Sequence, residues 1–166
     1  MTTEPIETEV KLYVPELAAV ADRIVAAGGV LHAPRVMERN WRYDTPDHTL
    51  TPAGIVLRLR QDTRTRLTYK APGTVIDGAL SRLEAEVTVS DFAQMDLILQ
   101  RLGFAPYVIY EKYRTTYRLG DAEIVLDELP YGTFVEIEAD APVIAQMIAA
   151  LELGAFPRYT LSYMAL

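Results

Sequence analysis

Residues 6–12 read IETEVKL, a stretch in which polar and apolar side chains alternate. If this stretch is a β-strand, Glu7, Glu9 and Lys11 lie on one face and the aliphatic residues between them lie on the other. A face wetted by solvent would account for the polar residues. Two acids beside a lysine would also suit a lined interior that holds a metal ion and an anion, because hard cations prefer carboxylate oxygens.

The composition is that of an ordinary globular protein. Of the 166 residues, 50% are hydrophobic and 23% are charged, so we predict one domain over residues 1–166. The formal charge of −7 argues against a nucleic-acid partner, which needs a broad basic surface. We expect no membrane span, since no apolar run approaches the roughly 18 residues required. A beginning without signal-peptide features and the absence of cysteine favour the cytoplasm.

Three segments have the apolar spacing of amphipathic helices: residues 15–29, 90–103 and 140–154. The first has Pro15 in its opening turn and ends at Gly28 and Gly29. Ser90 is the predicted N-cap of the second segment and Asp140 that of the third. Gly103 and Gly154 are their predicted ends.

Most of the remaining chain alternates between polar and apolar residues, which predicts half-buried antiparallel strands. Besides residues 6–12, the predicted strands cover residues 56–62, 66–70, 82–89, 111–119, 122–129 and 134–140. Residues 73–79 and 127–132 are predicted turns. Seven or eight such strands with three helices indicate an α+β protein dominated by antiparallel sheet.

Pairs of like charge recur on the polar faces of these strands: Glu7/Glu9, Arg58/Arg60, Glu84/Glu86, Lys112/Arg114 and Glu136/Glu138. Like charges on neighbouring positions repel, so a sheet shaped by stability alone would interleave the signs. The pattern suggests that a ligand brings the counter-charges. Acid pairs suit Mg²⁺ or Mn²⁺, and arginine pairs suit phosphate oxygens. Charged faces that line the inside of a closed sheet would leave the helices to pack outside.

The stretch from Glu7 to Lys11 resembles the ExExK signature of the CYTH superfamily, the triphosphate tunnel metalloenzymes. That superfamily includes class IV adenylyl cyclases, thiamine triphosphatases and inorganic triphosphatases. Further similar stretches follow in the family's order: RYDTPDHTL (42–50), LRLR (57–60), LTYK (67–70), RLEAEV (82–87), EKYR (111–114) and IVLDELPYGTFVEIE (124–138). The resemblance implies an antiparallel closed eight-stranded β-barrel, the triphosphate tunnel, with inward charges and helices packed outside.

The resemblance also implies roles for the charged residues. The metal-binding acids would be Glu7, Glu9, Glu86, Asp127, Glu136 and Glu138, with Mg²⁺ or Mn²⁺ as the cofactor, and which of Glu84 and Glu86 reaches the metal stays open. The cradle for the triphosphate would be Lys11, Arg58, Arg60, Lys70, Lys112 and Arg114. Lys11 and Lys70 are the candidate catalytic residues that orient or deprotonate the nucleophile. Any one of these residues could instead belong to a structural ion pair.

Three functions fit this set of residues. The leading one is a metal-dependent triphosphatase acting on inorganic triphosphate or on a small organic triphosphate, such as thiamine triphosphate or a nucleotide. The alternative is a class IV adenylyl cyclase that makes cyclic AMP and pyrophosphate from ATP. The second alternative is a non-enzymatic module that binds polyphosphate or a nucleotide. The architecture is compatible with a homodimer. We expect Tyr43 and Asp44 to be structural and residues 159–166 to pack near one tunnel mouth.

Overall fold

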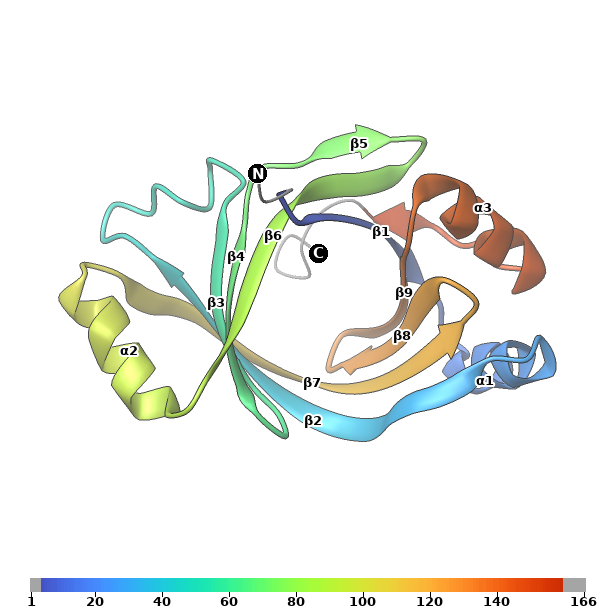
Figure 1. Ribbon diagram of the computed structural model, residues 1–166, viewed down its shortest axis with the longest axis horizontal. Coiled ribbons are helices and arrows are strands. Elements are labelled where there is room, and N and C mark those ends of the chain that lie inside the picture. The colour runs from blue at the N-terminus through green and yellow to red at the C-terminus, as the bar shows by residue number, and fades with distance from the viewer. Residues whose placement is uncertain (1–3, 160–166) are drawn as a thin grey trace. The chain divides into compact units, whose positions relative to one another are not determined.

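The computed structural model describes residues 4–159, so most of the predicted tunnel-mouth segment 159–166 lies outside the described residues. Among the described residues it contains ten strands and three helices (Figure 1). In chain order they are β1 (Ile6–Tyr13), α1 (Leu17–Ala26), β2 (Val30–Asp44), β3 (Val56–Gln61), β4 (Thr65–Lys70), β5 (Thr74–Ile76), β6 (Ala79–Val89), α2 (Phe92–Arg101), β7 (Ala105–Leu119), β8 (Ala122–Leu129), β9 (Gly132–Glu138), α3 (Ala141–Ala150) and β10 (Arg158–Tyr159).

The strands form one hydrogen-bonded sheet in the order β10-β1-β9-β8-β7-β2-β3-β4-β6-β5. An additional pairing of β1 with β6 closes eight of the described strands into a ring and leaves β10 and β5 as short additions. Neighbouring strands run antiparallel, as β3 does with β4 and β8 with β9. The predicted closed eight-stranded antiparallel barrel is therefore confirmed.

The described chain divides into two compact units. Unit 1 comprises residues 4–6, 37–73 and 82–111, and unit 2 comprises residues 7–36, 74–81 and 112–159. Each unit contains part of the sheet and at least one helix, and each is described below by itself. The prediction of one domain over residues 1–166 stays a prediction.

The core of unit 2 lies between one face of the sheet and two helices. Val10 and Leu12 of β1 are buried together with Ile124 of β8 and Ile137 of β9. The apolar stripes of α1 and α3 pack on this cluster, and both helices lie beside β8 and β9 in Figure 1. Because the helices cover the apolar face, the charged residues that alternate with it point to the other face.

Unit 1 repeats this arrangement with α2. Leu99 of the helix packs with Tyr43 and Leu59, and the ring of Phe92 meets Trp41 edge-on at 5.0 Å between centroids. The helix contacts β3 (Figure 1). In this unit too, the helix packs on the apolar face of the strands and leaves the charged face uncovered by helix.

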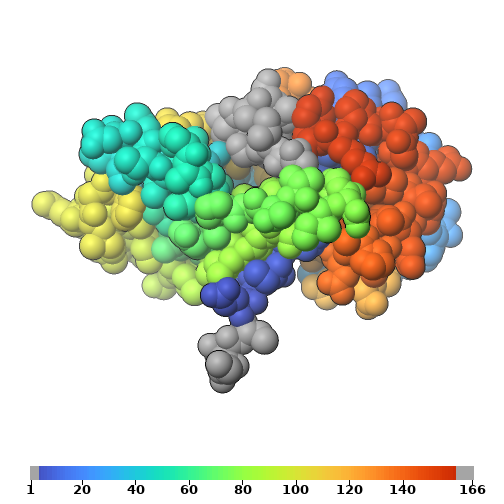
Figure 2. All heavy atoms as spheres, turned by 90° about the horizontal axis from the view of Figure 1, so that it is seen from above, coloured from blue at the N-terminus to red at the C-terminus, as the bar shows by residue number. Residues whose placement is uncertain are grey.

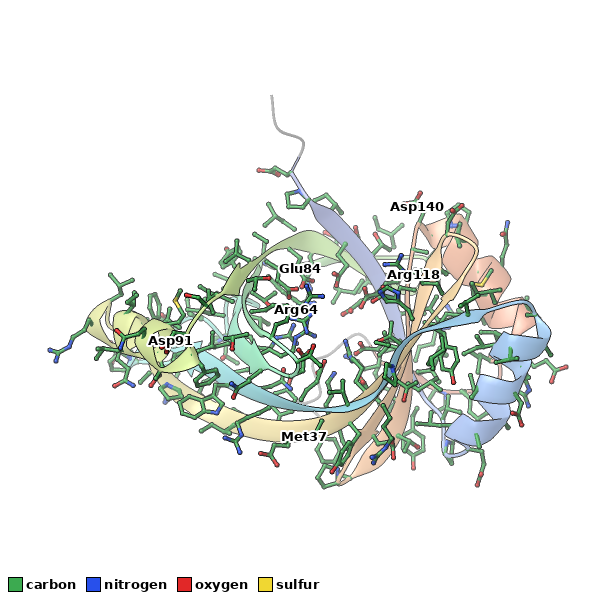
Figure 3. The ribbon with its side chains drawn as sticks, turned by 60° about the horizontal axis from the view of Figure 1, so that its bottom comes forward. Met37, Arg64, Glu84, Asp91, Arg118 and Asp140 are labelled. Atoms are coloured by element: carbon green, nitrogen blue, oxygen red, sulfur yellow. The ribbon has the colours of Figure 1, made fainter. Side chains whose placement is uncertain are left out.

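The three predicted helices are present, with three corrections at their ends. The first helix, α1, begins at Leu17 with Glu16 as its N-cap, so Pro15 lies before the helix and not in its opening turn. The N-cap of α2 is Asp91, not Ser90, because the Asp91 carboxylate accepts a hydrogen bond from the Gln94 backbone at 2.9 Å. The chain leaves α3 through Glu152 in the left-handed region (φ 56°), so Gly154 does not end the helix as expected. Figure 3 labels Asp91 and Asp140, which directly precede α2 and α3. None of the described helices is long and apolar enough to cross a membrane.

Three of the described strands were not predicted: β2, β5 and the two-residue β10. The 15-residue β2 escaped detection because its first half, with Pro34 and clustered apolar residues, does not alternate. The short β5 lies within residues 73–79, which were predicted as a turn, and the turn itself is confined to Asp77 and Gly78, both with positive φ. The other predicted strands are present, most of them with longer bounds.

Candidate functional site

Strand register gathers a first set of charges on one face of unit 2. Glu9 lies directly opposite Glu138, and Lys11 lies opposite Glu136, so β1 and β9 present these side chains together. The same face continues across the sheet with Asp127 of β8 and with Lys112 and Arg114 of β7, since Arg114 lies opposite Asp127. All eight site residues predicted in this unit therefore share one face: Glu7, Glu9, Lys11, Lys112, Arg114, Asp127, Glu136 and Glu138.

Three of these acids form a compact cluster, here called the acid triad: Glu7, Glu9 and Glu138. One carboxylate oxygen from each lies within 4.8 Å of those of the other two. Burial raises the pKa of Glu138 to about 8, and the negative charges of Glu7, Glu136 and Glu9 add to the rise, against the opposing effect of Arg114. Three crowded carboxylates form an all-oxygen donor set, which fits the ligand preference of Mg²⁺ or Mn²⁺.

The other two predicted metal ligands in unit 2, Asp127 and Glu136, contact basic side chains. Asp127 is fully buried and accepts a hydrogen bond from Lys112 Nζ at 2.8 Å. The Arg114 guanidinium donates hydrogen bonds to both carboxylate oxygens of Asp127, at 2.7 and 2.6 Å, and a further one to Glu136 at 2.7 Å. Lys11 Nζ lies 3.1 Å from the other oxygen of Glu136. Among the described residues, Asp127 and Glu136 therefore bind the lysine and arginine side chains of this face, and they are not members of the acid triad.

Unit 1 has a charged face of its own, and it is mainly basic. Register places opposite one another Arg42 and Arg58, Arg58 and Thr68, and Lys70 and Glu84. With the alternate residues of the same strands, the unit 1 charged face contains six basic residues (Arg42, Arg58, Arg60, Arg66, Lys70 and Arg82), three acidic residues (Glu38, Glu84 and Glu86) and the polar residues Asn40 and Thr68.

The acids of this face are engaged by neighbouring groups. Lys70 Nζ lies 2.5 Å from Glu84, and Arg60 reaches Glu38 and Glu86 at 3.4 Å each. The Thr68 hydroxyl donates to Glu86 at 2.8 Å. Figure 3 labels Glu84 on its strand β6. The sequence left open which of Glu84 and Glu86 reaches a metal. In the structure Glu84 pairs with Lys70, a predicted catalytic residue, and Glu86 pairs with Arg60, which was predicted to bind phosphate.

Sequence reasoning missed the whole contribution of β2 to this face: Glu38, Asn40 and Arg42 are buried there. A signal was present, because these polar residues alternate with the aromatic pair Trp41 and Tyr43. It was missed because no strand was predicted over residues 30–44, although residues 42–50 resemble the CYTH family.

Tyr43 and Asp44 have structural roles, as expected. The buried Tyr43 hydroxyl donates to Asp96 of α2 at 2.8 Å, and burial raises the pKa of Tyr43. Asp44 holds the loop after β2 by accepting hydrogen bonds from the backbone of Thr45, Leu50 and Thr51. Burial alone would raise the pKa of Asp44, but these hydrogen bonds lower it to about 2.

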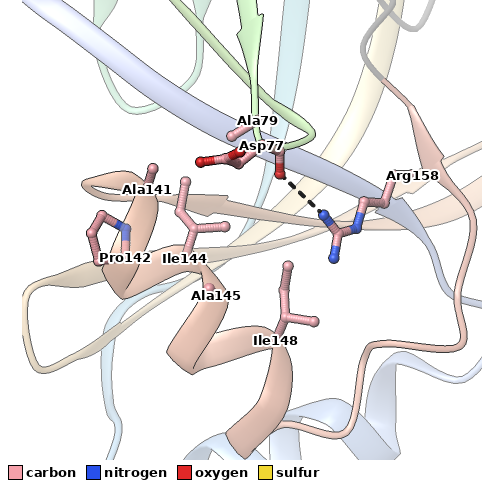
Figure 4. Close-up of a pocket in the computed structure, with 8 residues that line it drawn as sticks. All are labelled: Asp77, Ala79, Ala141, Pro142, Ile144, Ala145, Ile148 and Arg158. Atoms are coloured by element: carbon pink, nitrogen blue, oxygen red, sulfur yellow. Dashed lines mark hydrogen bonds between the residues drawn. The ribbon is translucent and has the colours of Figure 1, made fainter.

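A pocket of about 310 Å³ lies in unit 2 away from these charged residues. It is lined mainly by the apolar residues of α3 and by the β5–β6 turn, where Arg158 donates to the Asp77 backbone oxygen at 3.5 Å (Figure 4). The hairpin of β5 and β6 lies against α3 on the face seen in Figure 2. None of the predicted site residues lines this pocket.

Known proteins resemble the chain over nearly its whole length. A candidate adenylate cyclase from Methanocaldococcus jannaschii is 26% identical over 149 residues, which cover 89% of this chain and 84% of the relative. The structure of a candidate adenylate cyclase from Vibrio parahaemolyticus superposes with a TM-score of 0.83 at 21% identity and 98% coverage of both chains. A candidate adenylyl cyclase from Hippeastrum, described as revealing a dominant triphosphatase activity, superposes with a TM-score of 0.73 at 20% identity, over 96% of this chain and 93% of that one.

The model of the CYTH domain family matches residues 5–154. This range contains both charged faces and every predicted site residue. The chain therefore belongs to the CYTH domain family.

Proposed function

We propose that this protein is a metal-dependent triphosphatase that cleaves inorganic triphosphate or a small organic triphosphate. The observation that carries the proposal is the acid triad, in which one carboxylate oxygen from each of Glu7, Glu9 and Glu138 lies within 4.8 Å of those of the other two. Such crowding of like charge stabilises neither the sheet nor the carboxylates, and a divalent cation offsets it.

The charge balance of the two faces supports this proposal. In unit 2 the predicted site residues are five acids and three bases, whereas the unit 1 charged face contains six bases and three acids. An acid-rich face suits a cation, and a base-rich face suits the phosphate oxygens of a polyanion. A divalent metal ion would account for the acid-rich face, and a triphosphate would account for the base-rich face.

Different charged residues serve to bind the phosphate chain, to hold the metal ion and to orient the attacking water. Arg58 and Arg60 bind phosphate oxygens through their guanidinium groups, and the buried Lys112 and the partly buried Arg114 add positive charge on the unit 2 face. Glu7, Glu9 and Glu138 would hold a Mg²⁺ or Mn²⁺ ion, which would supply positive charge to offset the negative charge of the triphosphate. Lys70, held at 2.5 Å from Glu84, and Lys11, held at 3.1 Å from Glu136, orient the attacking water.

An adenylyl cyclase is the second candidate. It is favoured by the names of the relatives from Methanocaldococcus jannaschii and Vibrio parahaemolyticus, whereas the description of the Hippeastrum protein favours the triphosphatase. Both reactions bind the same triphosphate group, so the phosphate-binding residues serve either one. A triphosphatase requires only that the triphosphate group is bound, whereas a cyclase also needs a site for adenine and ribose.

A product assay separates these functions. The purified protein is incubated with inorganic triphosphate, thiamine triphosphate or ATP, each with Mg²⁺ or with Mn²⁺, and phosphate, pyrophosphate and cyclic AMP are measured separately. We expect phosphate release as the dominant product. Cyclic AMP with an equal amount of pyrophosphate would establish the cyclase, and no product in any condition would leave only a binding function.

A variant pair ties the activity to the acid triad. Glu7→Gln combined with Glu9→Gln should abolish turnover while the circular dichroism spectrum stays that of the folded protein, because the amides keep the shape but bind cations weakly. Glu16→Gln, an exposed position before α1, is the matched control and should keep full activity.

A further inference from the structure

The amide of Asn40 is an unusual group within the unit 1 charged face. Asn40 is fully buried in the second half of β2, and neither its amide oxygen nor its amide nitrogen has a hydrogen-bond partner among the described residues. Burying a polar amide without a hydrogen-bond partner destabilises the folded state. The free protein therefore gains no stability from having an amide here.

Strand register shows which face of the sheet Asn40 belongs to. Its direct neighbour across the strand pair is Arg60, so the two side chains share one face. Arg60 itself interacts with Glu38 and with Glu86, each at 3.4 Å. The amide thus lies among groups that bond to one another and not to it.

The chemistry of an amide suits the ligand that this face would receive. The Asn side chain offers two N–H donors without a charge. On a face that already contains six basic residues, another cation would add repulsion, whereas a neutral donor adds a hydrogen bond to an anion without it. A phosphate oxygen held by Arg60 would lie within reach of the residue directly opposite.

We propose that Asn40 is a substrate-positioning residue, whose amide donates a hydrogen bond to a non-bridging phosphate oxygen held beside Arg60. This inference rests on the proposed binding of a triphosphate. It assigns to β2 a role in recognition of the phosphate chain, in addition to the basic residues of β3 and β4.

Two substitutions of similar size test the assignment. Asn40→Leu removes the donor and leaves an apolar group, and Asn40→Asp replaces the donor with an acceptor of negative charge. Binding of inorganic triphosphate without any divalent cation is measured by calorimetry, so that the acid triad takes no part. We expect affinity to fall about 10- to 100-fold for Asn40→Leu, and further for Asn40→Asp because the carboxylate repels phosphate.

The stability of the free protein provides an independent readout. Both variants should unfold at the same or a higher temperature than the wild type, since Leu avoids burying an amide and Asp gains basic neighbours. In the Mg²⁺-dependent reaction, Asn40→Leu should raise KM with little change in kcat. The control is Thr65→Val, a buried position on the opposite face of β4, which should bind triphosphate normally.

The outcomes separate this inference from the proposed function. If the wild type binds triphosphate and both Asn40 variants bind it equally well, Asn40 has no role in positioning. A lower unfolding temperature with unchanged affinity would show that the amide is a structural group bonded through ordered water. If the wild type neither binds nor cleaves triphosphate, the proposed function fails and the assignment of Asn40 fails with it.

Discussion

Replacement of Glu138 by Gln should stabilise the metal-free protein at pH 8 and remove its response to divalent cations. In the folded protein the pKa of Glu138 is about 8, mainly because of burial and then because of Glu7 and the other nearby acids. An unfolded chain releases this proton near the ordinary value of 4.5. The folded state therefore binds the extra proton between these two values, and stability falls as the pH rises through this window.

The size of the effect follows from the displacement of the pKa. A rise from 4.5 to about 8 corresponds to an upper bound of about 5 kcal/mol at pH 8. Glu138 is only partly buried, and water screens part of the repulsion, so we expect about 2 kcal/mol. Gln has no proton to lose, and the variant should gain this amount at pH 8 and almost nothing at pH 4.

Urea denaturation with a chelator present measures this difference at several pH values. Other groups also titrate, so the informative quantity is the free energy of unfolding of the variant minus that of the wild type, which should grow from pH 5 to pH 8. The same subtraction for Glu16→Gln, an exposed acid, should stay constant. A second measurement adds Mg²⁺ at pH 8, which should raise the Tm of the wild type and not that of Glu138→Gln.

A flat difference between Glu138→Gln and the wild type across this pH range would refute the reasoning. It would mean that the three carboxylates do not crowd together in solution, and the main argument for a metal ion at this place would be lost. A Tm that Mg²⁺ raises equally in both proteins would instead place the cation elsewhere.

Three further predictions concern other parts of the site. Asp127→Asn leaves the buried Lys112 and the partly buried Arg114 beside a neutral group and should cost about 3–5 kcal/mol in urea denaturation. A loss under about 1 kcal/mol would contradict the burial of the Lys112–Asp127 pair. Between pH 4 and pH 2 the free energy of unfolding should fall by about 2 kcal/mol more in the wild type than in Asp44→Ala. The reason is that the lowered pKa of Asp44 stabilises the fold only while the carboxylate is ionised, and equal losses in the two proteins would contradict this. Lys70→Met should lower kcat at saturating substrate, whereas an unchanged kcat with a raised KM would make Lys70 a binding residue alone.

The sequence predicted those elements whose alternation is unbroken. Residues 6–12 and 122–129 match β1 and β8 closely, because each has an apolar face that packs against helices and a polar face that does not. Prediction failed where a local pattern was ambiguous. Ser90 and Asp91 are both good caps, and only the position at which the chain turns into α2 decides in favour of Asp91.

The candidate site was predicted as a set of residues but not as a set of contacts. Alternation places Glu7 and Glu9 on one face, yet nothing local shows that Glu138 joins them and that Asp127 and Glu136 bind Arg114 instead. These contacts depend on which strands are neighbours, and β1 and β9 lie far apart in the chain. The buried amide of Asn40 is equally invisible in the sequence, since its lack of partners depends on neighbours from another strand.

The sequence by itself determined the family, the strand faces and the kinds of charge that each face presents, because side-chain alternation is a property of a single strand. Only the tertiary structure decided which acids crowd into a triad, which are neutralised by lysine or arginine, and which polar group is buried without a partner. The physical reason is that register and burial arise from packing between distant segments, and the pKa of a carboxylate follows from that packing.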